Sequence, residues 1–142
     1  MSTVIVDHVR LRPAMDGDFN FVYSSWLKSY RQSEATKPFS DEIYFEGQRK
    51  LITQILMHSK VVVAVSVDDP SHIYGWVCFE PHSPFPVLHY VYVKHVYRTF
   101  GVGRMLLGEM LEGPVVYSHD DAFKSRLSQG SYFNPYKSLG GV

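Results

Sequence analysis

The chain has 142 residues, a length typical of one domain, and apolar residues make up 45% of it. Its 14 Lys and Arg balance 14 Asp and Glu, so the formal charge is zero and no basic field attracts nucleic acid as a bulk polyanion. A core of this size needs no disulfide or metal to stabilise it. We expect a single domain, residues 1–142, that does not bind nucleic acid.

The single cysteine, Cys78, lies in an apolar run and indicates a buried thiol in a reducing compartment. No segment has the pattern of a signal peptide, and no apolar run approaches the roughly 18 residues that a membrane span needs. No paired metal-ligand spacing occurs among His72, His82, His89, His95 and His119. We therefore expect a cytoplasmic protein with no metal and no membrane partner.

The first half of the chain predicts one strand and two helices. Residues 4–11 are rich in β-branched side chains and stop before Pro13, which suits a strand. Asp16 or Asp18 can cap a following helix, and Ser40 or Asp41 a second one. Apolar residues recur at helical spacing in both, as Phe19, Val22, Tyr23, Trp26, Leu27 and Tyr30, then as Tyr44, Leu51, Ile52, Ile55 and Leu56.

The period then changes to that of strands. Residues 60–67 are almost continuous Val and Ala, as in a strand covered on both faces. A turn at residues 68–70 separates them from a strand at residues 73–79. Prolines at 81, 84 and 86 interrupt the ladder before a third strand, residues 87–93. Three consecutive strands indicate an antiparallel meander.

The last third predicts a helix at residues 101–112, stopped by Gly113 and Pro114. A short strand at 115–117, a helix at 120–129 and a loop or edge strand follow. The order β-α-α-β-β-β-α-β-α, with a weak final strand, predicts an α/β (α+β) fold. Its sheet is mixed and mostly antiparallel, with helices on both faces. The succession of strand, helix and strand from residue 87 to 117 indicates two parallel strands joined by a right-handed crossover.

One segment has the composition of an anion site. The strand at 87–93 leads into Arg98, Gly101, Gly103 and Arg104, and then into an apolar helix. The first turn of a helix leaves N–H groups without partners, and glycines let phosphate oxygens approach these amides closely. The arginines add charge-assisted donors. The same glycines could simply make a tight strand-to-helix turn.

The pattern Arg98-x-x-Gly101-x-Gly103 resembles the Arg/Gln-x-x-Gly-x-Gly/Ala motif of the GNAT superfamily of N-acetyltransferases, and the element order over about residues 9–117 is similar. The resemblance implies acetyl-CoA as co-substrate. It also implies that the strand at 87–93 splays from that at 115–117, so that the backbones of Tyr92 and Val93 pair with the pantetheine arm. The pyrophosphate would contact Arg98, Thr99, Phe100, Gly101, Val102, Gly103 and Arg104. Residues 21–30 are also similar to small bacteriophage acetyltransferase-like proteins, which would place the protein in a host cytoplasm.

Acyl transfer by direct attack needs a base for the acceptor amine and a proton donor for the leaving thiolate. Family members often carry the base on or near the fourth strand, which here offers His89 and Glu80. Each has an alternative role, His89 as a structural histidine and Glu80 as a solvated strand end. The usual leaving-group acid is a Tyr in the helix after the fifth strand, but residues 120–129 contain Phe123 and no Tyr. Tyr117 is the candidate in its place, while Tyr132 and Tyr136 follow that segment.

The leading hypothesis is an N-acetyltransferase that acts on an amine of a small molecule or protein. The alternative is a non-catalytic acyl-CoA-binding or protein-interaction module on the same fold, favoured by the missing helix Tyr and a shortened closing hairpin. Edge strands and exposed aromatics also favour a homodimer.

Overall fold

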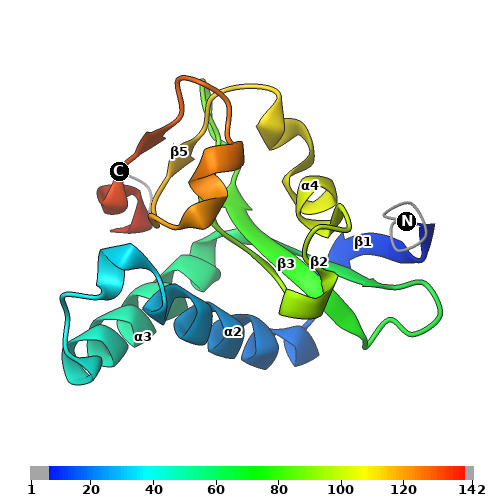
Figure 1. The fold of residues 1–142 in the computed structure, drawn as a ribbon, viewed down its shortest axis with the longest axis horizontal. Coiled ribbons are helices and arrows are strands. Elements are labelled where there is room, and N and C mark those ends of the chain that lie inside the picture. Colours follow the sequence, from blue (N-terminus) through cyan, green and yellow to red (C-terminus); the bar gives the residue numbers. More distant parts are fainter. Residues whose placement is uncertain (1–6, 140–142) are drawn as a thin grey trace.

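A mixed sheet lies at the centre of the computed structural model, which describes residues 7–139 (Figure 1). The described part of the sheet has six strands in chain order: β1 (Val9–Pro13), β2 (Lys60–Ser66), β3 (Ile73–Glu80), β4 (Val87–Val93), β5 (Val116–Tyr117) and β6 (Tyr132–Phe133). Strands β1 to β4 pair antiparallel, whereas β5 pairs parallel with both β4 and β6. The predicted meander and the predicted parallel pair are both confirmed.

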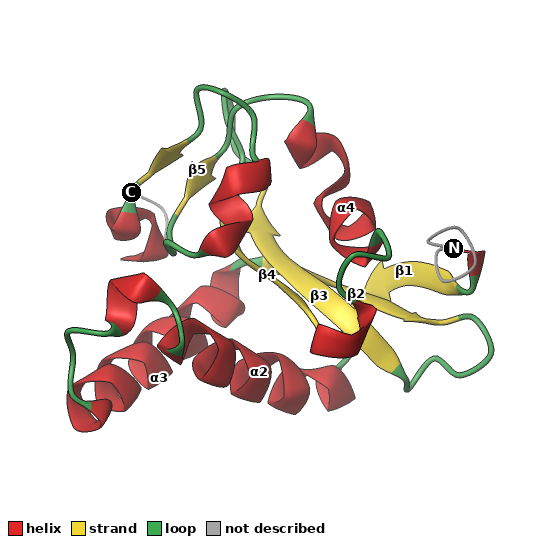
Figure 2. Cartoon of the chain, viewed as in Figure 1, coloured by secondary structure: helices red, strands yellow, loops and turns green. Residues whose placement is uncertain are grey.

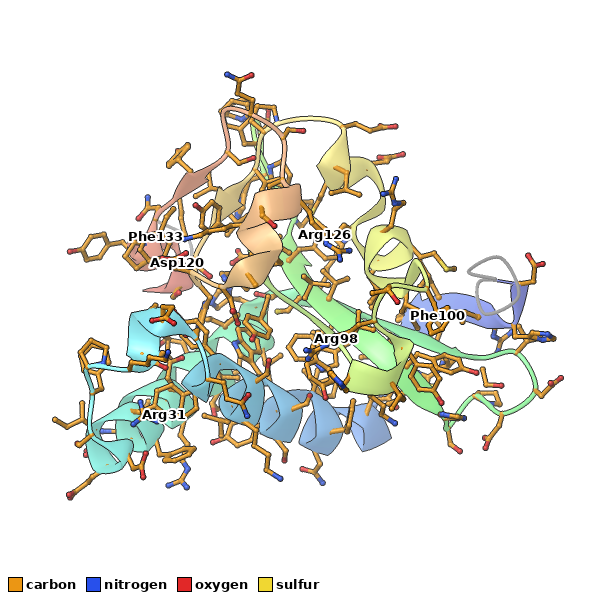
Figure 3. All side chains as sticks on the ribbon, in the orientation of Figure 1. Arg31, Arg98, Phe100, Asp120, Arg126 and Phe133 are labelled. Atoms are coloured by element: carbon orange, nitrogen blue, oxygen red, sulfur yellow. The ribbon has the colours of Figure 1, made fainter. Side chains whose placement is uncertain are left out.

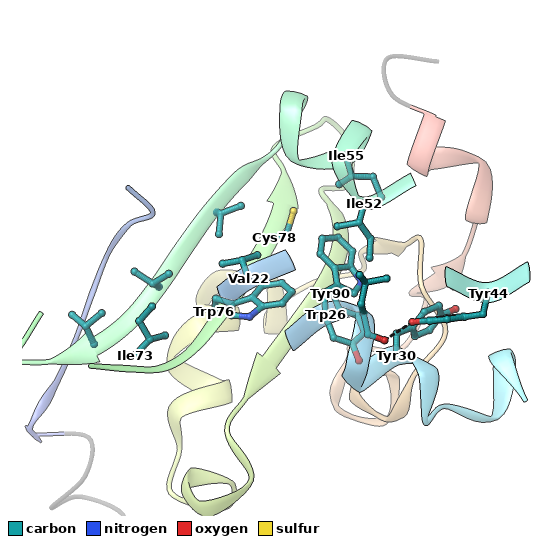
Figure 4. Close-up of a cluster of buried hydrophobic side chains, with 14 residues drawn as sticks. Val22, Trp26, Tyr30, Tyr44, Ile52, Ile55, Ile73, Trp76, Cys78 and Tyr90 are labelled. Carbon is teal, nitrogen blue, oxygen red and sulfur yellow. Dashed lines mark hydrogen bonds between the residues drawn. The ribbon is translucent and has the colours of Figure 1, made fainter. Parts of the chain in front are cut away.

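Helices cover both faces of this sheet, as predicted (Figure 2). The long helices α2 (Phe19–Arg31) and α3 (Asp41–His58) pack on one face, and the short helix α4 (Val102–Leu107) packs on the other. The face under α2 and α3 buries the larger cluster, in which Trp26 and Trp76 are fully buried with ring centroids 5.4 Å apart (Figure 4). Cys78 lies in the same cluster, and burial raises the pKa of its thiol, so it is an inert core residue.

The helix starts follow local hydrogen bonding. Ser40 caps α3 as predicted, because its side chain accepts a hydrogen bond from the N–H of Ile43 at 3.2 Å. Asp18 precedes α2 but makes no such cap. Its carboxylate instead forms an ion pair with Arg12 at 2.6 Å and accepts the N–H of Met15 at 2.7 Å. Asp18 therefore ties β1 to the start of α2.

Three predicted elements have other bounds. The first strand begins at Val9, and residues 4–6 of the prediction lie outside the described residues. The helix predicted at 101–112 is only the six residues of α4, because Gly108 has a φ of 50° and the chain continues as the 3₁₀ turn η4 (Gly108–Leu111). The prediction of a helix at residues 120–129 is wrong. That segment holds a 3₁₀ turn, η5 (Ala122–Arg126), since it has few apolar side chains with which to form a packed helical face.

Candidate functional site

Strands β4 and β5 pair over only two residues. Val87 lies opposite Val116 and Leu88 opposite Tyr117, and the N–H of Ser118 then donates to the Leu88 carbonyl at 3.1 Å. Beyond this rung the two segments have no further pairing, and we call the region between them the split. A β-bulge begins it, because Cys78 pairs with Tyr90 while Phe79 pairs with Leu88. The extra residue is His89, and a bulge of this kind bends a strand away from its neighbour.

The free edge of β4 faces the split. Lys94 donates its N–H to Tyr74 at 2.9 Å, so alternation along the strand turns the backbone of Tyr92 toward β3 and that of Val93 toward the split. Tyr92 lies opposite Trp76 in the β3–β4 register, and its backbone groups face β3 rather than the split. The carbonyl of Val93 does face the split, where it accepts a hydrogen bond from Arg98 Nε at 2.9 Å.

The glycine loop, residues 98–104, lies at the far end of the split, after the 3₁₀ turn η3 (His95–Tyr97). Thr99 and Gly101 have φ values of 76° and 89°, and the positive φ of Thr99 is a strained backbone conformation of the kind that clusters at ligand sites. The first turn of α4 leaves the N–H groups of Val102, Gly103 and Arg104 without intrahelical acceptors. Because α4 is so short, these N–H groups and the arginines matter more than its dipole. The side chains of Arg98 and Arg104 are exposed, and Phe100 is half-buried.

Arg126 joins this loop from the other side of the split (Figure 3). Its Nη1 lies 3.7 Å from the position that a Cβ on Gly103 would take. Arg98, Arg104 and Arg126 thus give the loop three guanidinium groups. Sequence reasoning missed Arg126, because no motif relates η5 to a loop more than 20 residues earlier in the chain.

Phe123 spans the two strands near the closed end of the split. Its ring centroid lies 5.6 Å from that of Tyr90 and 6.2 Å from that of Tyr117. A ligand that paired with the β4 edge would therefore lie against the Phe123 ring.

A chain of buried polar groups begins at the same place; we call it the polar chain. His89, completely buried, has its Nδ1 2.6 Å from Ser118 Oγ and its Nε2 2.5 Å from Glu80 Oε2. Ser118 Oγ also lies 3.0 Å from His119 Nδ1, and His119 Nε2 lies 3.2 Å from Gln48 of α3. The structure thus brings the two predicted base candidates, His89 and Glu80, into direct contact. It also leaves neither ring nitrogen of His89 free to meet a substrate.

Glu80 is surrounded by imidazoles. Besides His89, it contacts His82 Nε2 through Oε1 at 3.0 Å and His58 Nδ1 through Oε2 at 3.3 Å. Burial alone would raise the pKa of Glu80, but hydrogen bonds from His89 and His82 outweigh it and bring the pKa below its ordinary value. Burial lowers the pKa of His89 despite the nearby carboxylate. The pair is therefore an ionised carboxylate beside an imidazole that favours its neutral form.

The tyrosine candidates lie apart from this pair. Tyr117 packs with the cluster on the α4 face and lies near Phe133, with the two rings tilted and 5.8 Å between their centroids. It therefore approaches the split from the face opposite His89. Tyr132 and Tyr136 are exposed at the far edge, in and after β6.

A depression of about 580 Å³ lies on the α2 side of the end of β4, with Arg10, Arg12, Phe21 and Lys94 among its lining residues. Arg12 is held by Asp18, and Lys94 lies over the Phe21 ring at 5.2 Å. None of its lining residues belongs to the polar chain. It is therefore separate from the polar chain.

Among residues 7–139 no group of His, Cys, Asp and Glu is arranged to hold a metal ion. The described helices include none that is long and apolar enough to cross a membrane.

No protein-family model matches the chain, and no curated protein does. Several solved structures do match the chain. A proposed acetyl transferase from Pyrococcus furiosus superposes with a TM-score of 0.54 at 20% identity, covering 70% of this chain and 69% of that one. A PaiA N-acetyltransferase from Thermoplasma acidophilum, in complex with coenzyme A, gives 0.51 at 18% identity, covering 71% and 68%. A GCN5-related N-acetyltransferase from Kribbella flavida gives 0.50 at 22% identity, covering 75% and 64%.

The chain therefore has the fold of the GNAT acetyltransferases, as the motif and the element order predicted. It spans about two thirds of each of these three proteins. At such low identity the likeness establishes the fold alone.

Proposed function

We propose that the protein is an acetyl-CoA-dependent N-acetyltransferase that transfers the acetyl group to an amine by direct attack. One observation carries this proposal: the sheet splits after Leu88, and the glycine loop with its arginines lies where the free edge of β4 ends. A strand edge and an anion site in succession match the two parts of acetyl-CoA, an amide-containing arm and a pyrophosphate. The Thermoplasma neighbour was solved with coenzyme A bound.

In this proposal the N–H groups at Val102, Gly103 and Arg104 and the guanidinium groups of Arg98 and Arg126 hold the pyrophosphate. The loop fits such a group sterically, because Gly103 leaves its N-terminal turn without a side chain. Thr99, Phe100 and Gly101 shape the turn. Val93 offers its backbone to the pantetheine arm once Arg98 turns from the Val93 carbonyl to the phosphates.

The acyl carbonyl would then lie at the closed end of the split, near the β-bulge at His89. An amine attacks a thioester only as the uncharged base, so the site must take up its proton. Glu80 and His89 supply that capacity as an ionised carboxylate bonded to an imidazole. Tyr117, on the opposite face, is the candidate that protonates the leaving thiolate.

Four parts of the proposal rest on the family resemblance and composition. These are acetyl as the acyl group, an amine of a small molecule or protein as the acceptor, the cytoplasm as the location and a homodimer as the assembly. The bacteriophage resemblance of residues 21–30 stays a sequence-based prediction.

Calorimetry with acetyl-CoA tests the proposal. The wild-type protein should bind it, and Gly103→Glu should abolish binding because it places a carboxylate against the pyrophosphate. A Cβ at Gly103 meets its nearest atoms at 3.6 and 3.7 Å, an ordinary contact, so the fold should survive. Gly47→Glu is the matched control, since a Cβ there meets nothing within 4 Å and Gly47 lies in α3. No heat of binding from the wild-type protein at millimolar acetyl-CoA would refute the proposal.

A non-catalytic acyl-CoA-binding module is the second candidate. Two observations favour it: segment 120–129 has no Tyr, and both ring nitrogens of His89 are engaged. Release of free thiol from acetyl-CoA that depends on an added amine would exclude it.

A further inference from the structure

The polar chain connects the closed end of the split with the protein surface. From Ser118 it passes through His89 to Glu80, over contacts of 2.6 and 2.5 Å. From Glu80 it continues 3.0 Å to His82, whose side chain is 46% exposed. Ser118 and His89 are 4% and 0% exposed, so protons can cross a buried region along hydrogen bonds without a break.

Such a chain is costly to bury in a core unless all its members are satisfied, and here each has its partners. Apolar residues could fill the same space at no such cost. His89, as the bulge residue, contributes no ladder pairing of its own. Its side chain instead joins β3 to the segment after β5, through Glu80 and Ser118.

Ser118 is the member nearest the place where a ligand on the β4 edge would end. Its N–H makes the last rung to Leu88, at 3.1 Å, after which that edge becomes free. Since both nitrogens of His89 are engaged, a proton from the split can reach His89 only through the Ser118 hydroxyl. His119 Nδ1 lies 3.0 Å from the same hydroxyl. Ser118 has a single hydroxyl hydrogen, so the relay requires His119 to donate its Nδ1–H to Ser118 Oγ, with the Gln48 amide turned so that its NH₂ group faces His119 Nε2. His119 is then a positioning residue that directs the Ser118 hydrogen at His89.

We propose that Ser118, His89, Glu80 and His82 form a proton relay, in which Ser118 is the catalytic residue that meets the acceptor amine. The inference rests on the proposed transferase function and names a group that neither the motif nor the fold assigns.

The amine nitrogen bonds to the carbonyl carbon, and the carbon–sulfur bond breaks with its electron pair leaving on the coenzyme A sulfur. The N–H proton of the amine moves to Ser118 Oγ, while the Ser118 proton moves to His89 Nδ1. The proton on His89 Nε2 passes to Glu80, then to His82 and to water.

The charged and titratable groups around the relay favour proton movement from Ser118 toward His82. Glu80 faces His89 from β3, His58 reaches Glu80 from the end of α3, and His119 follows β5. Burial favours the neutral imidazole of His89, which can therefore accept a proton, and Glu80 stabilises the imidazolium once formed.

The test compares Ser118→Ala and His82→Ala with the wild-type enzyme, with acetyl-CoA as donor and n-butylamine or an Nα-blocked lysine peptide as acceptor. For Ser118→Ala we expect kcat to fall about 100-fold, as for loss of a general base, with the affinity for acetyl-CoA unchanged. His82→Ala should slow turnover less, and imidazole added to the buffer should restore it, because that end of the relay is exposed. His8→Ala is the control, an exposed histidine remote from the relay in sequence.

Each alternative outcome is distinct. Wild-type turnover with unchanged kcat and pH profile in Ser118→Ala overturns the relay and leaves the transferase proposal standing. Acetylation of Ser118 by acetyl-CoA alone, detected by peptide mass spectrometry, also overturns it, because Ser118 would then be a nucleophile. Absence of acetyl-CoA binding to the wild-type protein refutes the transferase proposal and the relay together. If Ser118→Ala fails to bind acetyl-CoA, the effect of imidazole on His82→Ala tests the relay instead. Turnover of His82→Ala that imidazole restores supports the relay, and turnover that imidazole does not restore overturns it.

Discussion

Arg98 folds back over the end of β4, and its Nε donates a hydrogen bond to the carbonyl oxygen of Val93 at 2.9 Å. This side chain belongs to the glycine loop, yet it lies on the backbone edge that a pantetheine arm would use. The same residue therefore touches both of the surfaces that the proposed donor needs, and in the proposed complex with acetyl-CoA it has to exchange one partner for the other.

Replacing Arg98 tests this exchange. A hydrogen bond to a charged group is worth roughly 1.5–3 kcal/mol, so Arg98→Ala should weaken acetyl-CoA binding roughly 10- to 100-fold. Calorimetry measures it, with Arg49→Ala on the exposed face of α3 as the control. Tighter binding in Arg98→Ala would mean that the bond to Val93 opposes the donor more than the charge attracts it.

Arg126 offers a second test, because only the tertiary structure brings it to the loop. Since the side chain is exposed, solvent screens its charge and its contribution should be modest. We expect Arg126→Ala to raise the dissociation constant for acetyl-CoA by roughly two- to tenfold, at about 0.5–1.5 kcal/mol, and the effect to shrink in high salt. An effect that persists undiminished at high ionic strength would contradict an electrostatic role.

Gly75 of β3 lies directly against the backbone of β4. A Cβ there would overlap the carbonyl oxygen of Tyr92 and come within 3.1 Å of Val93 Cα. Because both atoms are backbone, Gly75→Ala should destabilise the fold by about 1–3 kcal/mol, seen as a lower urea midpoint. Gly47→Ala should instead stabilise it by about 0.5–1 kcal/mol, since it adds a helix former in open space. Equal effects of the two changes would show that the contact at Gly75 is relieved elsewhere.

The buried ring of His119 predicts a pH dependence of stability. Burial lowers the pKa of His119 from 6.5 to about 3. Below pH 6.5 the unfolded chain therefore binds a proton at this residue, whereas the folded chain does not. The free energy of unfolding should therefore fall as the pH drops from 6.5 toward 3, by up to about 1.4 kcal/mol per pH unit from this group. Urea unfolding of wild type and His119→Gln across this range measures it. The variant should show the shallower slope, and identical slopes would contradict the assignment.

Much of the architecture could be predicted from the sequence, because each element buries a repeating apolar pattern. The run from residue 60 to 67 and that from 87 to 93 predicted β2 and β4 almost to the residue. The segment after residue 119 could not be predicted in this way. Its few apolar side chains fix neither a helix nor its length, and the packing of Phe123 across two strands determines its position.

The sequence by itself determined the glycine loop and the edge strand before it, since both depend on neighbours along the chain. Only the tertiary structure decided how the groups of the proposed relay meet. The β-bulge at His89 turns that side chain to the same face as Glu80, and the two-residue pairing of β5 brings Ser118 beside it. These residues are up to 38 positions apart in the chain, so no local spacing relates them. Their contact exists because a strand register and a buried hydrogen-bond requirement are satisfied together.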